Sequence, residues 1–362
     1  MTLETGNSKP IRVLVADDSA FMRTALTRMI ESDPELRVGG TAQTGQEALD
    51  KIPRLNPDVV TLDVEMPGIN GLETLRHIMK AFPRPVIMVS SLTQEGAETT
   101  LEALSIGAFD YLPKQSSFVS LDIIKIRDEL IAKIKAAAGS HRRPRMTPPA
   151  SVAPPVPQVR HVPNHPPASL VALGTSTGGP KALQEILPML PAGLPVPVVI
   201  VQHMPPGFTG PFARRLDNLC KVQVKEAQTE ETLSPGTIYI APAGKHITVY
   251  RNSSARAAVR LSPTPENTLH IPSVDVMMLS VAESFRSLAM GVIMTGMGAD
   301  GAKGMQAIAR EGGVTVGQDE ASCTVYGMPR ACAEAGILQR VVGLQQIPQQ
   351  ILQAIHYKPR VQ

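Results

Sequence analysis

Five side chains in the first third of the chain are of the types needed to form and hold an acyl phosphate. Asp17, Asp18, Asp63, Ser90 and Lys114 each stand at or just after the end of a short apolar run. Clustered carboxylates bind hard divalent cations such as Mg²⁺. A carboxylate nucleophile, a hydroxyl donor and a lysine complete the groups used in phosphoryl transfer to an aspartate. The pattern predicts a phosphorylation pocket.

Asp17 and Asp18 have a second explanation, because they precede a helical pattern that begins near Ser19 and acidic residues often cap helices. The setting of Asp63 favours a phosphorylation pocket over helix capping. Asp63 is followed by EMPGINGLE (65–73), a turn-forming stretch that would leave its carboxylate exposed as a nucleophile.

A serine, a histidine and an aspartate in the second half could form a hydrolytic triad. Ser176 lies in GTSTG (174–178), which fits G-x-S-x-G, the strand-to-helix turn that presents a nucleophilic hydroxyl. His203 and Asp300 follow two other apolar runs. If the three runs are parallel strands, their side chains meet at one edge of the sheet. The chain order Ser, His, Asp differs from that of α/β-hydrolases.

Each of these signals is compatible with another role. The G-x-S-x-G turn can be a phosphate cradle or a packing feature, and a histidine at a strand end can be structural. The segment 296–301, GMGADG, also matches the dinucleotide pattern G-x-G-x-x-G, with Asp319 about twenty residues on. Against that pattern, Asp300 would face the pyrophosphate. The same glycines can bring backbone N–H groups toward an oxyanion.

The elements that position these residues follow from hydrophobic periodicity. Up to residue 138, five short β-branched runs alternate with helical patterns, which predicts a parallel sheet covered on both faces. After residue 167 the alternation restarts, and a β-rich stretch between 237 and 262 predicts an antiparallel hairpin inserted in a second, Rossmann-like α/β domain.

The two halves are separated by a segment rich in proline and arginine. Nine of the residues 142–167 are proline and none is acidic. Proline favours extended backbone without internal hydrogen bonds, as in linkers. We therefore expect domains at 10–138 and 168–357, joined by a linker at 139–167.

Composition excludes several classes of protein. The net charge of +3 gives no excess that would indicate nucleic acid as the main partner. The three cysteines, Cys220, Cys323 and Cys332, have neither disulfide-framework nor zinc-site spacing. The first residues do not follow the pattern of a signal peptide, and no apolar run is long enough to span a membrane. We expect a cytoplasmic protein without membrane insertion.

The N-terminal constellation resembles the receiver domain of bacterial response regulators over residues 11–138. The resemblance implies a doubly wound, flavodoxin-like fold with five parallel strands and Asp63 as the phosphoacceptor. It also implies roles for the neighbouring residues: Mg²⁺ binding by Asp17, Asp18, Asp63 and the Glu65 backbone carbonyl, phosphoryl contacts from Ser90 and Lys114, and an aromatic switch at Tyr111. Gln115 stands where receivers usually have proline, so it is open whether the Lys114–Gln115 bond is cis.

The second half resembles the chemotaxis methylesterase family CheB. The resemblance rests on GTSTGGP, VQHMPPGFTGPFARRLD, APAGKH, PSVDV, MTGMGADGAKGM and QDEASCTVYGMP, and with the receiver it extends from residue 11 to about 355. It implies Ser176 as nucleophile, His203 as general base and then acid, and Asp300 as the residue that orients His203. It further implies an oxyanion donor at the Met297 N–H and a site lined by Thr177.

These resemblances imply a phosphorylation-activated serine hydrolase that acts on glutamate methyl esters of chemoreceptors and also deamidates receptor glutamines. A histidine kinase would donate the phosphoryl group, and Mg²⁺ would serve the receiver alone. Two alternatives remain. One is a receiver joined to an NAD-dependent oxidoreductase, based on residues 296–301. The other is a DNA-binding response regulator, although the second half has no helix-turn-helix pattern.

Overall fold

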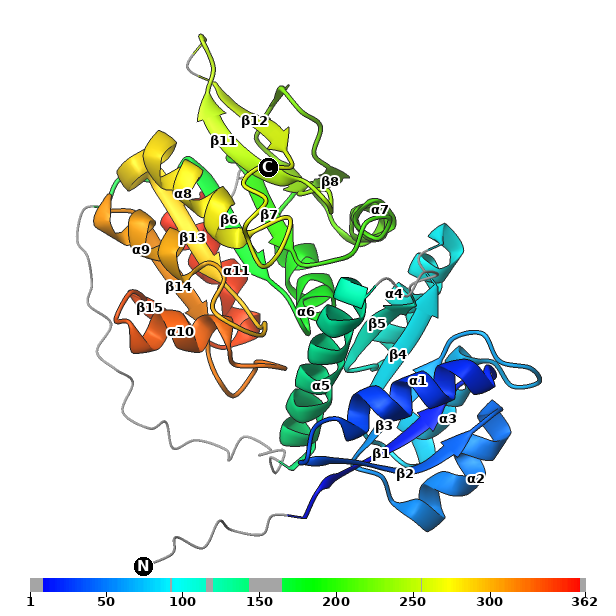
Figure 1. Ribbon diagram of the computed structural model, residues 1–362. Coiled ribbons are helices and arrows are strands. Elements are labelled where there is room, and N and C mark those ends of the chain that lie inside the picture. The colour runs from blue at the N-terminus through cyan, green and yellow to red at the C-terminus, as the bar shows by residue number, and fades with distance from the viewer. Residues whose placement is uncertain (1–8, 92, 115–119, 143–164, 255, 359–362) are drawn as a thin grey trace, which may run out of the picture. The chain divides into compact units, whose positions relative to one another are not determined.

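The computed structural model describes residues 9–91, 93–114, 120–142, 165–254 and 256–358. The chain divides into two compact units, residues 1–147 and 148–362. Each is α/β, so the predicted fold class is confirmed (Figure 1). Most of the predicted linker and Gln115 lie outside the described residues, so the linker bounds and the Lys114–Gln115 bond stay predictions.

The N-terminal unit has one sheet in the order β2-β1-β3-β4-β5, and every strand pair in it is parallel. Its strands are β1 (Ile11–Ala16), β2 (Leu36–Ala42), β3 (Val59–Asp63), β4 (Val86–Ser91) and β5 (Asp110–Lys114). Its helices are α1 (Ala20–Glu31), α2 (Gly45–Leu55), α3 (Gly71–Ala81), α4 (Gln94–Ile106) and α5 (Ser120–Arg142). Helix α1 contacts α5, whereas α3 contacts α2 and α4, so helices cover both faces (Figure 1).

Local sequence explains where these elements begin. Ser19, Thr44, Asn70 and Thr93 each accept a hydrogen bond from a backbone N–H in the first turn of the helix that follows. Every residue of β3 is buried, as expected for a central parallel strand covered on both faces. Asp63 ends that strand.

The C-terminal unit has a seven-stranded parallel sheet in the order β15-β14-β13-β6-β7-β10-β8. Its strands are β6 (Leu170–Thr175), β7 (Val198–Gln202), β8 (Gln223–Glu226), β10 (Thr237–Ile240), β13 (Ala289–Ile293), β14 (Val314–Gln318) and β15 (Arg340–Val342). The helices are α6 (Gly179–Ile186), α7 (Thr209–Leu219), α8 (Val274–Phe285), α9 (Ala302–Arg310), α10 (Met328–Glu334) and α11 (Ile347–Ala354), with short 3-10 turns at Leu187–Met189, Arg286–Leu288 and Leu344–Gln346.

The predicted hairpin is part of a small antiparallel sheet, β11-β12-β9. Its strands are β9 (Glu231–Thr232), β11 (His246–Arg251) and β12 (Ala257–Ser262). This inserted sheet lies beside α8 (Figure 1), and Val249, Val259 and residues of α8 belong to one buried core. The stretch 237–240, which the β-rich pattern grouped with the hairpin, instead pairs in the parallel sheet.

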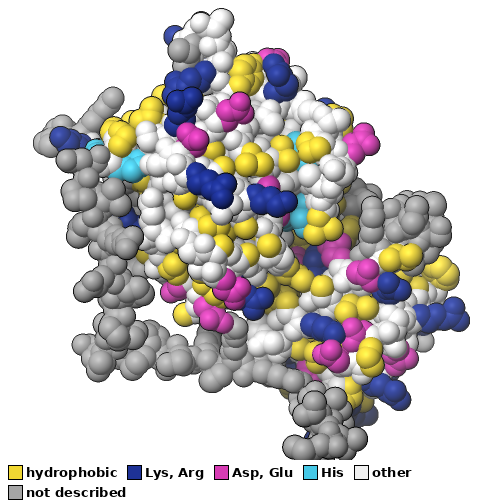
Figure 2. Space-filling model, turned by 60° about the vertical axis from the view of Figure 1, so that its left-hand side comes forward, with side chains coloured by type: hydrophobic (Ala, Val, Ile, Leu, Met, Phe, Trp, Pro, Cys, Tyr) yellow, Lys and Arg dark blue, Asp and Glu magenta, His cyan; other side chains and the backbone are white. Residues whose placement is uncertain are grey.

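Among the described residues no helix is long and apolar enough to cross a membrane. On the face that Figure 2 presents, acidic and basic side chains are interspersed. That surface does not show the concentrated basic stripe typical of nucleic-acid binding.

Candidate functional site

The structure brings the three N-terminal carboxylates together at the carboxyl edge of the sheet. One oxygen each from Asp17, Asp18 and Asp63 lies within 4.8 Å of the others. Asp17 and Asp63 are buried and Asp18 is exposed. Ser19, rather than either aspartate, caps α1 with its side chain, and Asp17 instead accepts the Ser19 N–H at 2.9 Å. Helix capping therefore does not account for the cluster.

Lys114 closes this pocket from the end of β5. Its Nζ lies 2.6 Å from Asp63 Oδ2 and 3.2 Å from Asp17 Oδ2. Burial raises the pKa of Asp63 to about 6, although the hydrogen bond from Lys114 opposes the shift. Burial lowers the pKa of Lys114, but the two carboxylates outweigh it and the net shift is upward. The lysine thus stays charged beside an aspartate that is costly to ionise.

The donor set fits a hard cation. Asp17 Oδ2 and Asp63 Oδ2 are buried and share the single ammonium group of Lys114, so each keeps a lone pair for a further ligand. Buried carboxylate oxygens with spare lone pairs are the ligands that Mg²⁺ prefers. A hollow of about 560 Å³ opens beside the cluster and is lined by Asp18, Glu65, Asn70, Thr99 and neighbouring residues, which leaves access for a phosphodonor.

Two of the other receiver residues lie on the neighbouring strands β4 and β5, and Glu65 follows β3. Ser90 is buried at the end of β4, and its hydroxyl donates to the Gly96 carbonyl at 3.2 Å. The Glu65 N–H donates to Asp63 Oδ1 at 3.2 Å. Tyr111 is buried in β5, and its backbone carbonyl accepts from Lys133 at 2.6 Å.

In the C-terminal unit, Ser176 occupies the turn between β6 and α6. Its N–H donates to the Thr295 carbonyl at 3.0 Å, which ties the turn to the segment after β13. Gly178 has φ +79°, a conformation that favours glycine. A Cβ at Gly179 would lie 2.1 Å from Gln202 Oε1, so the turn also needs a glycine there.

His203 follows β7 and Asp300 follows β13, the two strands that flank β6 in the sheet, and the two side chains are in contact. His203 Nε2 lies 2.8 Å from Asp300 Oδ2. The Asp300 carboxylate also accepts the Ser273 hydroxyl at 2.9 Å and the N–H groups of Val274 and Asp275 at 2.8 and 3.0 Å. Burial alone would raise the pKa of Asp300, but these donors, His203 foremost, hold it far below its usual range. The N-terminus of α8 thus keeps Asp300 ionised.

The ionised carboxylate fixes the tautomer of His203. A carboxylate only accepts hydrogen bonds, so Nε2 carries the proton. His203 Nδ1 is buried and has no hydrogen-bond partner in the described chain. The imidazole ring stacks on that of His270, with centroids 3.9 Å apart and planes at 23°.

The loop after β13 runs beside the nucleophile. A Cβ at Gly296 would lie 2.9 Å from Ser176 Cβ, so the backbone leading to Met297 passes close to the serine side chain. Thr177 is buried, and its carbonyl accepts from Thr295 Oγ1 at 2.9 Å. The loop after β13 thus approaches Ser176 at Gly296 and binds Thr177 through Thr295, and the oxyanion role of the Met297 N–H stays a prediction.

The glycines of 296–301 have a packing explanation that involves no nucleotide. Gly296 leaves room for Ser176, and Gly301 has φ +99°, where a Cβ would lie 2.7 Å from Val274 Cγ1. Asp300 is engaged by His203 and α8. The dinucleotide pattern is thus accounted for by the turn that delivers Asp300.

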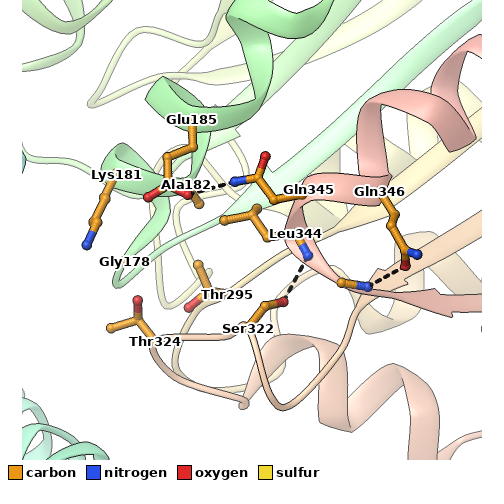
Figure 3. Close-up of a pocket in the computed structure, with 11 residues that line it drawn as sticks. Gly178, Lys181, Ala182, Glu185, Thr295, Ser322, Thr324, Leu344, Gln345 and Gln346 are labelled. Atoms are coloured by element: carbon orange, nitrogen blue, oxygen red, sulfur yellow. Dashed lines mark hydrogen bonds between the residues drawn. The ribbon is translucent and has the colours of Figure 1, made fainter. Parts of the chain in front are cut away.

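A pocket of about 390 Å³ adjoins the serine turn on the side toward β14 and β15 (Figure 3). Lys181 and Glu185 of α6 line it together with Gly178, the residue before that helix. Thr295, Ser322 and Thr324 line it from the segments after β13 and β14. Gln345 donates to Glu185 at 3.1 Å across the pocket, and the Leu344 N–H donates to Ser322 at 2.9 Å (Figure 3).

Three residues of the site were not predicted from the sequence. Gln202 donates to the carbonyls of Ser176 and His203, both at 3.0 Å. Ser273 holds Asp300, and His270 stacks on His203. Gln202 could have been found as the residue before His203 at a strand end. Nothing local in the sequence marks the other two as neighbours of the triad.

Comparison with known proteins gives matches for both units. The model of the CheB methylesterase family matches residues 171–351, and that of the response regulator receiver domain matches residues 13–124. The protein-glutamate methylesterase/protein-glutamine glutaminase 2 of Nitratidesulfovibrio vulgaris is 47% identical, covering 96% of this chain and 100% of that protein.

A protein-glutamate methylesterase/protein-glutamine glutaminase of Pyrococcus abyssi is 45% identical, covering 96% of this chain and 94% of its own length. The crystal structure of the Thermotoga maritima CheB methylesterase catalytic domain superposes with a TM-score of 0.50 at 38% identity. It covers 51% of this chain and 98% of that one.

Proposed function

Because the chain belongs to the CheB methylesterase family and carries a response regulator receiver domain, we propose that Ser176, His203 and Asp300 hydrolyse glutamate methyl esters of chemoreceptors. The enzyme is a protein-glutamate methylesterase and protein-glutamine glutaminase of chemotactic adaptation, activated by phosphorylation. The hydrogen bond of 2.8 Å between His203 and Asp300 beside the serine turn carries the residue assignment.

The chemistry follows from the tautomer of His203. Nδ1 is the nitrogen left to accept the Ser176 proton as the hydroxyl attacks the ester carbonyl. The imidazolium that forms is stabilised by the ionised Asp300, and it then protonates departing methanol. Water hydrolyses the acyl-enzyme by the same route, leaving a glutamate carboxylate. A glutamine side chain would follow the same path, with ammonia as the leaving group.

We assign the developing oxyanion to the Met297 N–H, supported by the close approach of Gly296 to Ser176. Thr177 lines the same site. The neighbouring pocket of about 390 Å³ is a place to hold the polypeptide that carries the ester. The triad needs no cofactor in this scheme, because the serine, histidine and aspartate supply the nucleophile, the base and the orienting charge.

We assign phosphorylation to Asp63, with the phosphoryl group donated by a histidine kinase. Asp17, Asp18, Asp63 and the Glu65 carbonyl would hold Mg²⁺, which supplies charge neutralisation for phosphoryl transfer. Lys114 and Ser90 would contact the phosphoryl oxygens. The Ser90 hydroxyl must leave the Gly96 carbonyl to do so, and Tyr111 would respond to that movement. A cytoplasmic location and the absence of membrane insertion stay predictions.

The test is to incubate the protein with methyl-labelled receptor membranes and measure volatile methanol, with and without a phosphodonor and Mg²⁺. Methanol release that rises with the phosphodonor is expected. Release that is absent under all conditions would contradict the assignment, and a blank assay with Ser176→Ala shows that the activity belongs to this site.

A further inference from the structure

His246 is a buried histidine that the proposed chemistry does not use. It is the first residue of β11 in the inserted sheet, and it is fully buried. Its Nδ1 lies 3.1 Å from the Ser273 N, and its Nε2 lies 3.0 Å from the Pro265 carbonyl oxygen. A backbone N–H can only donate, so Nδ1 must be the unprotonated nitrogen and Nε2 must carry the proton. One neutral tautomer satisfies both contacts.

Ser273, whose N–H donates to His246 Nδ1, is also the first of three consecutive residues that donate hydrogen bonds to the Asp300 carboxylate. Ser273 caps α8, and its hydroxyl donates to Asp300 Oδ1 at 2.9 Å. The next two N–H groups of α8 also donate to that carboxylate. A hydrogen-bonded path therefore leads from His246 through Ser273 and Asp300 to His203.

The other ring nitrogen of His246 holds the loop that carries His270. Besides the Pro265 carbonyl, Nε2 lies 3.3 Å from Thr268 Oγ1, and that hydroxyl donates to the His270 carbonyl at 2.9 Å. His270 in turn stacks on the ring of His203. His246 thus contacts both ends of the segment 265–273, in which Ser273 binds Asp300 and His270 stacks on the ring of His203.

The inserted sheet is itself fixed along α8. The Val249 N–H donates to Ser280 Oγ at 2.9 Å, and Ser284 Oγ donates to the Val249 carbonyl at 3.0 Å. Since β11 and α8 are held in register by these bonds, His246 has little freedom to move relative to Ser273.

We propose that His246 is a positioning residue of the esterase: as the Nε2–H tautomer it fixes Ser273 and the His270 loop, and through them the orientation of His203. This inference rests on the proposed assignment of His203 and Asp300 as catalytic residues. It gives the inserted sheet a part in catalysis. A purely structural histidine would affect stability and leave the kinetics of the folded enzyme unchanged.

Two substitutions separate these roles. In His246→Asn the side-chain oxygen stands where Nδ1 stands and can still accept from Ser273, whereas His246→Leu has similar bulk and no acceptor. We expect kcat for methanol release to fall by about 10- to 100-fold in the leucine variant, the range for small misplacements of a catalytic group, with KM little changed. The asparagine variant should recover most of that loss. Wild-type kcat in a folded His246→Leu enzyme would overturn the proposal.

A second readout does not depend on activity. Nitrogen-15 NMR of the histidine side chains in the full-length protein should show His246 protonated at Nε2, and the Nε2 proton of His203 bonded to Asp300. The His203 signal should shift in His246→Leu and be retained in His246→Asn. A proton on Nδ1 of His246 would overturn the proposal by itself, even if the leucine variant does not fold.

Failure of this inference is distinguishable from failure of the proposed function. If Ser176→Ala retains activity, the triad assignment fails, whatever His246 does. If Ser176→Ala is inactive while both His246 variants have wild-type kcat, only the positioning role fails.

Discussion

His203 binds Asp300 through Nε2, at 2.8 Å, and its other ring nitrogen, Nδ1, is buried without a hydrogen-bond partner in the described chain. Asp300 is in turn held by the start of α8. The acid therefore acts less as a proton acceptor than as a fixed negative charge. It selects one tautomer of the histidine and orients the ring.

Replacing Asp300 by Asn should lower kcat by about 10³- to 10⁴-fold, because an amide can donate to Nε2 and so select the wrong tautomer of His203. KM should change little, since Asp300 is not placed to touch the ester. Methanol release over a range of substrate concentrations separates the two constants. A variant with wild-type kcat and a raised KM would mean that Asp300 binds substrate.

Replacing Ser176 by Ala should abolish methanol release without changing the fold, because the hydroxyl is the group that forms the acyl-enzyme. Ser253→Ala is the matched control, since Ser253 is exposed in the turn between β11 and β12 and should leave the rate unchanged. If Ser176→Ala kept more than a few per cent of the wild-type activity, the nucleophile would have to be another residue.

Asp63→Asn should block phosphorylation by a small-molecule phosphodonor and abolish the stimulation that follows, while basal esterase activity persists. The amide cannot form an acyl phosphate, and the triad lies in the other compact unit. Radiolabelled phosphodonor and parallel methanol assays measure both effects. Asp50→Asn, on α2, is the control that should be labelled normally. Stimulation that survives in Asp63→Asn would place the phosphoacceptor elsewhere.

The pKa of Asp63, raised by burial to about 6 from 3.8, makes the stability of the receiver depend on pH. The folded receiver binds more protons than the unfolded chain between these two values, so its stability falls as pH rises through that window. At neutral pH without Mg²⁺, Asp63→Asn should therefore stabilise the receiver by about 1–3 kcal/mol.

Thermal unfolding of the receiver transition at pH 7 tests this expectation. Mg²⁺ should raise the midpoint of the wild-type protein, since it binds the folded state, and should raise that of Asp63→Asn less. A lower midpoint for Asp63→Asn without Mg²⁺ would show that the ion pair with Lys114 outweighs the cost of burying the charge.

Sequence was informative where the signal is local. Asp63 and Ser176 follow apolar strands and precede turn-forming stretches, so both their types and their settings could be read directly, and the alternation of strands and helices predicted the confirmed α/β fold. The strands β8, β9 and β15 were missed, because runs of two to four residues are too short to show a period.

The finer geometry of the site depends on packing between distant segments. Ser273 and Asp300 are 27 residues apart, and His203 and Asp300 are 97 apart. Which nitrogen of His203 meets Asp300, and that His270 covers its ring, follow from how α8 and the loop before it pack against the sheet. Neither periodicity nor motif spacing carries that information.

The position of β6 between β7 and β13 has a consequence for biosynthesis. The strand bearing the serine pairs early with β7, but its other edge stays open until β13 has been made, and Thr175 bonds to Thr295 120 residues later in the chain. Pairing over such separations is slow, because a long loop must close first. A nascent or truncated chain that ends before β13 lacks both Asp300 and one wall of the serine turn. With Ser176, His203 and Asp300 as the proposed triad, a chain that ends before β13 should therefore have no esterase activity.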